Sequence, residues 1–383
     1  FMTQLKNLYS DLRLIVDRTI RAIQTDKLVE EGVRNLHLEH KKLFVVAVGK
    51  AAWTMARASL NLLEDRIVGG IVITKYEHSE GPLRDFEIYE AGHPQPDKNT
   101  YRATQKVLDT CQSLDADTEI LMLISGGASA LFELPLIDTE LYEAINAELV
   151  GSGAGIEDIN TVRKRFSGVK GGKFAAALMP RPIWAIILSD VLGDSVETVA
   201  SGPVSTDTSD LAMAKAVAEK FDLKVTAEAL DKLEEQALRE GKQKLLEAVE
   251  VTNAKTYIGG SVSLLCELTA DIVEDWGYRP IVLTDRLDCE AREAGKFLAS
   301  IGLSHSQSKE NVAFIAGGET GVTLKGKGKG GRNQELALAA AKTLAGTKNV
   351  LLFSLGSDGT DGPTDAAGGF VDGQTWTKLE ENG

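Results

Sequence analysis

Four short apolar runs in the first half of the chain constrain its fold more than any other feature. They are KKLFVVAV (41–48), IVGGIVITK (67–75), TEILMLI (118–124) and PIWAIILSD (182–190), and each ends in a loop of glycine or polar residues. Runs this apolar are typical of strands in a parallel sheet, because both faces of such a strand are covered. Segments with helical periodicity separate them, and this alternation predicts a mostly parallel, doubly wound α/β domain of the Rossmann-like kind.

The second half repeats the alternation and predicts a second, smaller α/β domain. We expect strands at TYIGGS (256–261), PIVLTD (280–285), VAFIAGGE (312–319), GVTLK (321–325) and VLLFSLGSDG (350–359). The charged stretch 225–250 is helix-forming and is expected to be solvated or to cross between domains. A chain of 383 residues exceeds one typical domain. We place the boundary at residue 225, which gives domains 1–225 and 226–383.

Composition and net charge exclude some classes of binding partner and indicate the cellular compartment. The formal net charge of −14 argues against nucleic acid and against an anionic membrane surface. The longest apolar run is shorter than the roughly 18 residues of a membrane-spanning helix, and the first 20 residues lack the order of a signal peptide. Three widely spaced cysteines fit a reducing compartment. We expect a cytoplasmic α/β protein, and a homo-oligomer stays open.

Three glycine-rich loops in the second half carry the residue types of an anion site. They are GGET (317–320), KGKGKGGRNQE (325–335) and GSDGTDGPTDAAGG (356–369). Glycine lets a backbone approach a ligand closely, and successive free N–H groups bind anions. Cations in one loop and carboxylates in another are what phosphoryl transfer requires. The lysine-rich loop also fits a solvated, mobile hairpin, and glycine–aspartate runs are common in turns.

The known nucleotide-binding patterns match only in part. Gly326, Gly328 and Gly331 fit the spacing G-x-G-x-x-G before a helix-forming segment, which keeps an NAD(P)H enzyme open. No acidic residue ends the next strand about 20 residues later, as that fingerprint requires. Gly321–Lys327 has the spacing of a Walker A loop, but Gly328 stands where that loop has serine or threonine.

Loops of the first half supply further candidates. Lys50 lies between a predicted strand and a helix N-terminus, where its charge adds to N–H groups suited to an anion. The loop SGGASA (125–130) follows the third strand and fits either ligand binding or a tight turn. Asp190 ends the fourth strand, where a carboxylate can hold Mg²⁺ or accept a proton. His93, between two prolines, fits a structural or a substrate-contacting role.

A local cluster of basic residues stands out in this acidic chain. It predicts an anion site, with a solvated helix face as the alternative. Its members are Arg163, Lys164, Arg165, Lys170 and Lys173.

Taken in order, nine segments resemble the class II glycerate kinases, the glycerate 2-kinase family that carries a MOFRL domain. The segments are VGKAA, GHPQPD, SGGASAL, INTVRKRFSGVKGGKFA, SDVLGD, ASGP, GGET, GGRNQELAL and SDGTDGPTDAAGG. The resemblance covers essentially the whole chain. It implies a Rossmann-like larger domain, a smaller MOFRL-type domain and an active site in the cleft between them.

The resemblance also implies the reaction and its residues. The reaction is phosphorylation of D-glycerate at its 2-hydroxyl by ATP with Mg²⁺, which gives 2-phosphoglycerate. Carried over by position, the catalytic residues are Lys50, Asp190, Arg332 and Asp358, with one aspartate as base and the other on the metal in an order left open. The expected substrate- and nucleotide-binding residues are Gly49, Ser125, Gly126, Gly127, Ser189, Glu319 and Asn333.

Members of the family usually continue past the position of Gly383 to a glycine–threonine loop, so we expect the site to be incomplete. Two rival functions stay open at this point. One is an NAD(P)H-dependent hydroxypyruvate reductase, and the other is a non-catalytic protein that binds phosphorylated metabolites.

Overall fold

The computed structural model describes residues 9–16, 18–19, 25–188, 199–242, 247–260, 262–326, 328–357 and 359–382. The chain forms two compact units. The large unit is Thr25–Ser261, and the small unit combines Phe1–Gln24 with Val262–Gly383. The α/β class and the smaller second domain that the sequence predicts are both confirmed.

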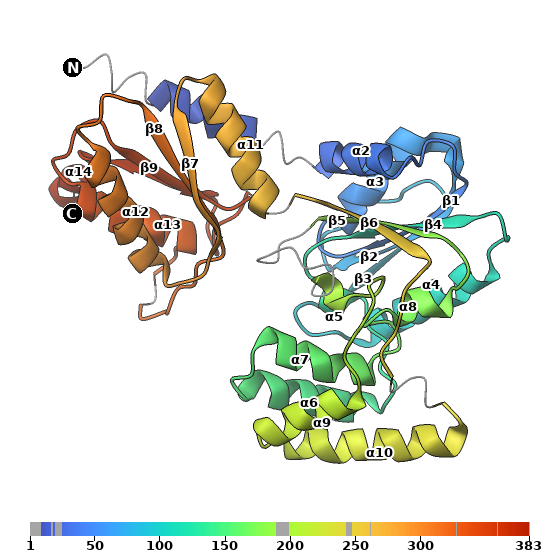
Figure 1. Ribbon diagram of the computed structural model, residues 1–383. Coiled ribbons are helices and arrows are strands. Elements are labelled where there is room, and N and C mark those ends of the chain that lie inside the picture. The colour runs from blue at the N-terminus through green and yellow to red at the C-terminus, as the bar shows by residue number, and fades with distance from the viewer. Residues whose placement is uncertain are drawn as a thin grey trace. The chain divides into compact units, whose positions relative to one another are not determined.

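A six-stranded parallel sheet forms the centre of the large unit (Figure 1). Its spatial order is β3-β2-β1-β4-β5-β6. The strands are β1 (Leu43–Val48), β2 (Ile67–Lys75), β3 (Phe86–Ala91), β4 (Glu119–Ile124), β5 (Ile183–Leu188) and β6 (Ala254–Gly259). The first three strands build the sheet outward in one direction from β1 and the next three in the other. This is the doubly wound arrangement that the apolar runs predict.

The domain boundary lies further along the chain than the sequence suggests. Residues 256–261 were expected in the second domain, but β6 pairs in parallel with β5 along the edge of the large sheet. The division therefore falls at Ser261 rather than at residue 225. The residues 9–16 and 18–19 are helical and belong to the small unit, whereas α2 (Thr25–Asn35) belongs to the large one.

Alternate residues of each strand face opposite sides of the sheet and build two separate cores. Val45 and Ala47 of β1 pack with α2 and α3 (Ala52–Leu63). Val46 and Val48 pack on the other side with α4 (Lys98–Ser113), α5 (Ala128–Leu131) and α8 (Lys173–Ala177). All six residues of β1 are buried, as expected for the central strand of a sheet with two covered faces.

Four helices form a separate layer of the large unit beyond α5 and α8 (Figure 1). They are α6 (Thr139–Gly151), α7 (Ile156–Arg163), α9 (Leu211–Lys220) and α10 (Lys224–Glu240). Residues 225–240 of the stretch that was expected to be solvated or to cross between domains belong to α10, which is amphipathic. Leu230 and Leu233 are buried against the other three helices, while its charged residues face outward. Asp210 caps α9 by accepting a hydrogen bond from the N–H of Met213 at 2.9 Å.

Besides the helical residues 9–16 and 18–19, the described part of the small unit contains two strand pairs and the four helices α11 to α14. In one pair, β7 (Arg279–Leu287) runs parallel to β8 (Val312–Gly318), and in the other β9 (Leu351–Leu355) runs antiparallel to β10 (Gly368–Asp372). The helices are α11 (Val262–Asp275), α12 (Ala291–His305), α13 (Arg332–Leu344) and α14 (Thr375–Glu381). The N-terminal residues pack here, since the Tyr9 hydroxyl donates to Asp372 at 2.5 Å.

The strand expected at 321–325 is wrong. Only Gly321 forms an isolated bridge, to Glu290. Two residues further on, the backbone N–H of Thr323 donates to the Glu290 carboxylate at 3.0 Å, and the Thr323 hydroxyl donates to the same group. A side chain therefore takes the place of a neighbouring strand, and the alternating pattern of this segment has no ladder to join.

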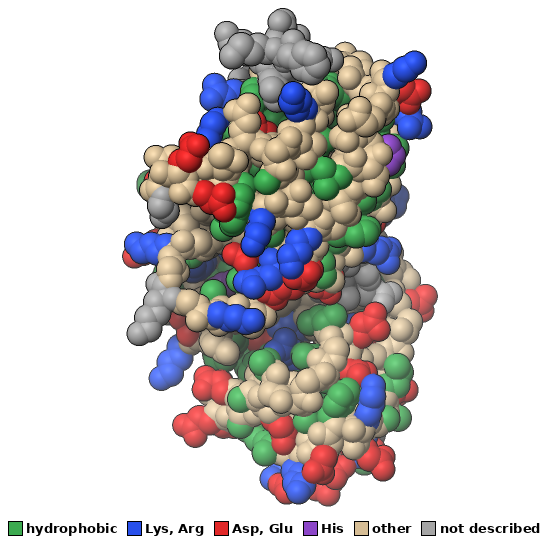
Figure 2. Space-filling view, turned by 90° about the vertical axis from the view of Figure 1, so that its left-hand side faces the viewer, with side chains coloured by type: hydrophobic (Ala, Val, Ile, Leu, Met, Phe, Trp, Pro, Cys, Tyr) green, Lys and Arg blue, Asp and Glu red, His purple; other side chains and the backbone are tan. Residues whose placement is uncertain are grey.

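No helix within the described residues is long and apolar enough to cross a membrane. On the face that Figure 2 presents, lysine and arginine side chains lie among aspartate and glutamate side chains. The charge of that face is therefore mixed, as on an ordinary protein surface.

Candidate active site

The strand order of the large unit reverses between β1 and β4, and this is where two predicted site loops meet. Open α/β sheets bind ligands at the carboxyl ends of the strands where the order reverses. Val48 of β1 lies opposite Ile124 of β4 at that edge. Gly49 and Lys50 follow the first strand, and Ser125, Gly126 and Gly127 follow the second. The structure therefore brings these five predicted residues together.

The backbone of Lys50 is held on both sides while its side chain stays exposed. Its N–H donates to the Gly126 carbonyl at 2.8 Å. Its own carbonyl accepts from the Thr74 hydroxyl at 3.3 Å and lies 3.3 Å from Nδ1 of His78. The Lys50 ammonium forms no ion pair with any carboxylate of the described residues. A lysine whose backbone is held in place and whose ammonium is exposed suits the binding of an anionic ligand.

Ser125, predicted to bind a ligand, makes a structural contact at this edge. Its side chain is buried, and its hydroxyl accepts a hydrogen bond from the N–H of Ala51 at 3.0 Å. Ala51 caps α3 without a side-chain hydrogen bond of its own, so Ser125 supplies the missing cap from the neighbouring loop. Gly49 allows this contact, because a Cβ atom at that position would lie 2.3 Å from the Ser125 oxygen.

Gly127 lies beside two other candidates of the first half, His93 and Lys50. It adopts a φ of 84° as the residue before α5, a backbone conformation that favours glycine. A Cβ atom there would lie 3.0 Å from Nε2 of His93 and 3.3 Å from Cγ of Lys50. The His93 ring therefore belongs to this group of residues. The backbone amides of Gly126 and Gly127 donate to no acceptor within the described residues.

In the small unit, Arg332 and Glu319 form an ion pair. Nη1 of Arg332 donates to Oε1 of Glu319 at 2.5 Å, and both side chains are about half exposed. Arg332 is the first residue of α13, and Glu319 directly follows β8. The carboxylate therefore holds the guanidinium near a second strand end, while solvent still reaches both groups.

Asn333 forms hydrogen bonds within the protein through its backbone N–H and through both polar atoms of its side chain. Its backbone N–H and side-chain amide both donate to Oδ1 of Asp361, at 3.0 and 3.2 Å. Its side-chain carbonyl accepts from the Ser354 hydroxyl at 2.6 Å. Asn333, predicted to bind a ligand, thus ties α13 to β9 and to the loop that follows it.

The hydrogen bonds of Asp361 are evidence against a dinucleotide site at the lysine-rich loop 325–335. Such a site requires a strand before the glycines and free N–H groups at the start of the next helix. Residues 321–325 form no strand, and Asp361 already accepts from the backbone N–H groups of Asn333 and Gln334. A pyrophosphate therefore finds these two donors occupied by a carboxylate.

Three predicted residues, Ser189, Asp190 and Asp358, lie outside the described residues. Among the residues that the structure does describe, no group of three or more histidine, cysteine, aspartate or glutamate side chains could hold a metal ion. Mg²⁺ in phosphoryl-transfer sites is usually held by one or two carboxylates together with phosphate oxygens. In the small unit, the Glu319 carboxylate pairs with Arg332, and the Asp361 carboxylate accepts hydrogen bonds from Asn333.

The chain matches two family models. Residues 11–234 match a domain of unknown function, DUF4147, and residues 312–383 match the MOFRL family. It is 46% identical to a D-glycerate 2-kinase of Thermotoga maritima over 96% of this chain and 87% of that protein. The chain belongs to the glycerate 2-kinase family.

Two further comparisons agree with this assignment. The chain is 37% identical to a glycerate 2-kinase of Pyrococcus horikoshii over 94% of this chain and 82% of that protein. A crystal structure of glycerate kinase from Thermotoga maritima matches with a TM-score of 0.89 and 43% identity, covering 98% of this chain and 90% of that one. The family resemblance that the nine segments carry is confirmed.

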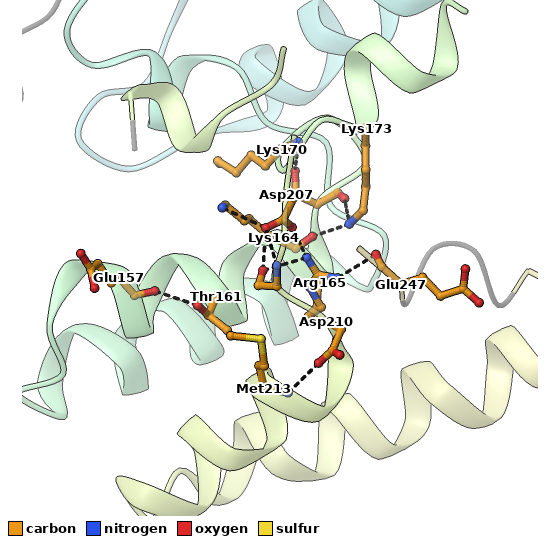
Figure 3. A network of polar contacts seen from close by, with 12 residues as sticks. Glu157, Thr161, Lys164, Arg165, Lys170, Lys173, Asp207, Asp210, Met213 and Glu247 are labelled. Atoms are coloured by element: carbon orange, nitrogen blue, oxygen red, sulfur yellow. Dashed lines mark hydrogen bonds and ion pairs between the residues drawn. The ribbon is translucent and has the colours of Figure 1, made fainter. Parts of the chain in front are cut away.

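Four residues of the basic cluster, all except the partly exposed Arg163, are buried and bound to other protein groups, so they form no solvated face. Lys164 and Arg165 are buried and paired with Asp207 (Figure 3). The distance from Nζ of Lys164 to Oδ1 of Asp207 is 3.2 Å. Arg165 also donates to the carbonyl of Glu247 at 3.3 Å and to the Ser209 hydroxyl at 3.2 Å. The Asp207 carboxylate therefore holds the chain before α9 against the segment that follows α7.

The other two lysines of the cluster are also buried. Lys170 pairs with Glu133 and donates to the carbonyl of Ser129 at 2.7 Å. Lys173 donates to the carbonyls of Lys164 and Ser167. Burial, together with the neighbouring charge of Arg165, lowers the pKa of Lys173 to about 7. These cations link α5 and α8 to the helical layer.

Sequence reasoning overlooked three carboxylates that organise these regions. Glu133 stands alone in the apolar run ALFELPL, and a single charge in such a run indicates a buried partner. Asp207 and Asp361 lie in polar loops, where nothing in the sequence sets them apart from ordinary turn residues.

Proposed function

We propose that this chain is an ATP-dependent D-glycerate 2-kinase, which phosphorylates the 2-hydroxyl of D-glycerate and yields 2-phosphoglycerate. The observation that carries the proposal is the 46% identity to a D-glycerate 2-kinase over 96% of the chain. The geometry adds support, because the exposed Lys50 lies at the reversal point of a doubly wound sheet and forms no ion pair with a described carboxylate.

In this proposal Lys50 and Arg332 bind the anionic groups of the two substrates, which are the carboxylate of glycerate and the phosphates of ATP. Phosphoryl transfer concentrates negative charge around the transferred group, and cations placed there stabilise the transition state more than the ground state. Arg332 offers the planar, two-pronged donor set that suits a carboxylate or a phosphate. Its partner Glu319 would orient the guanidinium before substrate arrives.

The backbone around Gly49, Gly126 and Gly127 would supply neutral donors in the same place. These glycines let a phosphate approach N–H groups closely, and the His93 ring lies beside them. Ser125 would contribute by fixing Lys50 and the first turn of α3 rather than by touching ligand.

The hydroxyl of glycerate needs a base and the nucleotide needs a divalent cation, and the proposal gives these tasks to Asp190 and Asp358. Mg²⁺, when bound, neutralises charge on the β- and γ-phosphates. One carboxylate with phosphate oxygens suffices for this ion. The other carboxylate would orient the 2-hydroxyl and accept its proton.

The test is the formation of ADP from ATP with D-glycerate, coupled to enolase, which consumes 2-phosphoglycerate but not 3-phosphoglycerate. We expect ADP formation that depends on D-glycerate and a product that enolase converts without a mutase. A parallel incubation with hydroxypyruvate and NADH should leave the nicotinamide absorbance unchanged. Loss of that absorbance without ADP formation would establish the reductase instead. Ligand-induced stabilisation without turnover of any small hydroxy acid would indicate a binding protein.

A further inference from the structure

Asp361 lies in the loop between β9 and β10 and is 2% exposed. Its two carboxylate oxygens accept four hydrogen bonds from consecutive residues of α13. Oδ1 accepts from the backbone and side-chain amides of Asn333, at 3.0 and 3.2 Å. Oδ2 accepts from the corresponding groups of Gln334, at 2.8 and 3.1 Å. One carboxylate is thus saturated by the first turn of one helix.

The backbone around this contact leaves no room for side chains. Gly331 is the N-cap of α13, and a Cβ atom on it would lie 2.2 Å from Cγ of Asp361. Gly362 has a φ of 61°, and a Cβ atom on it would lie 2.3 Å from the carbonyl oxygen of Gly330. The Thr364 hydroxyl donates to the Asp361 carbonyl at 2.7 Å and accepts from the Gln334 side chain at 2.9 Å. The loop between β9 and β10 therefore packs closely against the start of α13, and side chains larger than glycine at positions 331 and 362 would clash.

Arg332 directly precedes the two residues that Asp361 holds. A cap normally comes from the residue at the N-cap position itself, but glycine stands there and the cap reaches in from a distant loop. The direction in which Arg332 leaves the helix then depends on the placement of Asp361. Since all four donors lie within the protein, Asp361 itself is not available to a substrate.

We propose that Asp361 is a positioning residue for phosphoryl transfer, which acts through Arg332 by fixing the first turn of α13. This inference rests on the proposed function, which gives Arg332 an anionic group to bind. A displacement of about 1 Å in a catalytic group can cost about 100-fold in rate. We therefore expect Asp361→Asn to lower kcat/KM for glycerate on the order of 10- to 100-fold, because one oxygen that accepts two hydrogen bonds becomes an amide that donates.

The small unit offers a matched control in Asp372. This carboxylate is 4% exposed and accepts from the Tyr9 hydroxyl at 2.5 Å, the Gln374 N–H at 2.9 Å and the Thr375 hydroxyl at 2.8 Å. It serves the start of α14, which carries no residue of the proposed site. Asp372→Asn should destabilise the same unit in a similar way and leave kcat/KM of the folded protein within about twofold of wild type.

The experiment measures kcat and KM for glycerate and for ATP, together with thermal unfolding, for the wild type, Asp361→Asn and Asp372→Asn. Gln334→Leu is a milder variant, which removes the side-chain donor and keeps the backbone cap, and we expect an intermediate loss. In an Arg332→Ala background, Asp361→Asn should lower kcat/KM by less than twofold further, because the residue through which it acts is already gone.

The outcomes separate this inference from the proposed function. A wild type that makes no ADP with glycerate refutes the proposed function and the inference with it. An active wild type in which Asp361→Asn and Asp372→Asn lose activity equally refutes the positioning role alone. Independent, multiplicative losses from Asp361→Asn and Arg332→Ala also refute it. If Asp361→Asn does not fold, Gln334→Leu decides in the same comparison.

Discussion

Lys50 is a charged, exposed side chain at the reversal point of the sheet in the large unit. Its backbone is held by Gly126 and Thr74, while its ammonium forms no ion pair with a described carboxylate. Replacing it with methionine removes the charge and keeps the length of the side chain. We expect Lys50→Met to lower kcat on the order of 10³-fold, because a single cation on the transferred phosphate has an effect of that size or more.

The control for this prediction is Lys224→Met, at a lysine whose side chain is 80% exposed in the helical layer. It should leave both kcat and thermal stability unchanged, since such surface pairs contribute little. Circular dichroism should show the same fold for both variants. Turnover of Lys50→Met within a few-fold of wild type would remove Lys50 from the proposed mechanism.

Single residues of the candidate site were predictable to different degrees. The position of Lys50 follows from its place after an apolar run, because the carboxyl ends of parallel strands meet at one edge. Ser125 and Asn333 were assigned to ligand binding, but Ser125 caps α3 and Asn333 links α13 to β9. Their residue types suit both tasks, and the structural contacts depend on the position of a neighbouring loop, which the local sequence does not show.

At the scale of elements, the ion pairs of Asp207 join the helical layer to the rest of the large unit. Lys164 and Arg165 lie on one side of this contact, and Ser209 precedes α9 on the other. We expect Asp207→Asn to reduce the free energy of unfolding by about 3 to 5 kcal/mol, because it leaves two buried cations without their partner. This corresponds to a fall in Tm on the order of 10 °C.

Asp231→Asn is a suitable comparison, since Asp231 pairs with Lys215 between α9 and α10 but is 65% exposed. Its expected cost is below about 1 kcal/mol. Unfolding in urea, followed by circular dichroism, measures both. If the two variants proved equally stable, the buried pairs of Asp207 would not stabilise the large unit.

The strands and helices themselves were largely predictable, whereas their assignment to units was not. A continuous apolar run predicts a buried strand wherever it occurs, but it does not say which sheet the strand joins, and β6 joined the earlier one. The partners of the basic cluster could not be predicted from the sequence either. Its counter-charges lie far away in the chain, with Glu133 37 residues from Lys170 and Asp207 42 residues from Arg165. A local pattern of charge contains no information about such partners.

At the scale of the whole molecule, both units depend on ionised carboxylates that are held in place. Burial raises the pKa of Asp361 and of Asp372, but hydrogen bonds from backbone and side-chain groups outweigh it and the net pKa of each is lowered. The same balance lowers the pKa of Asp207 and of Asp97 in the large unit, where Ser209 and Tyr76 are the main donors. Acid should therefore destabilise both units.

The sign follows from linkage. A carboxylate whose pKa is lower in the folded than in the unfolded chain contributes stability above its ordinary pKa, near 3.8 for aspartate, and loses that contribution as the pH falls through the folded value. We expect Tm to be flat from pH 7 to about 5 on this account and to fall steeply below about 4. The Tm difference between wild type and Asp361→Asn should shrink over the same range, because protonation of Asp361 removes the charge that the variant lacks.

Thermal unfolding from pH 7 to 3 measures this, with Asp65→Asn, at a side chain that is 98% exposed, as the variant expected to follow the wild type at every pH. A gap between Asp361→Asn and wild type that stays constant down to pH 3 would mean that the ionised form of Asp361 is not what holds the first turn of α13. The stability lost in Asp361→Asn would then come from the amide donor that replaces an accepting oxygen, and not from the loss of the negative charge.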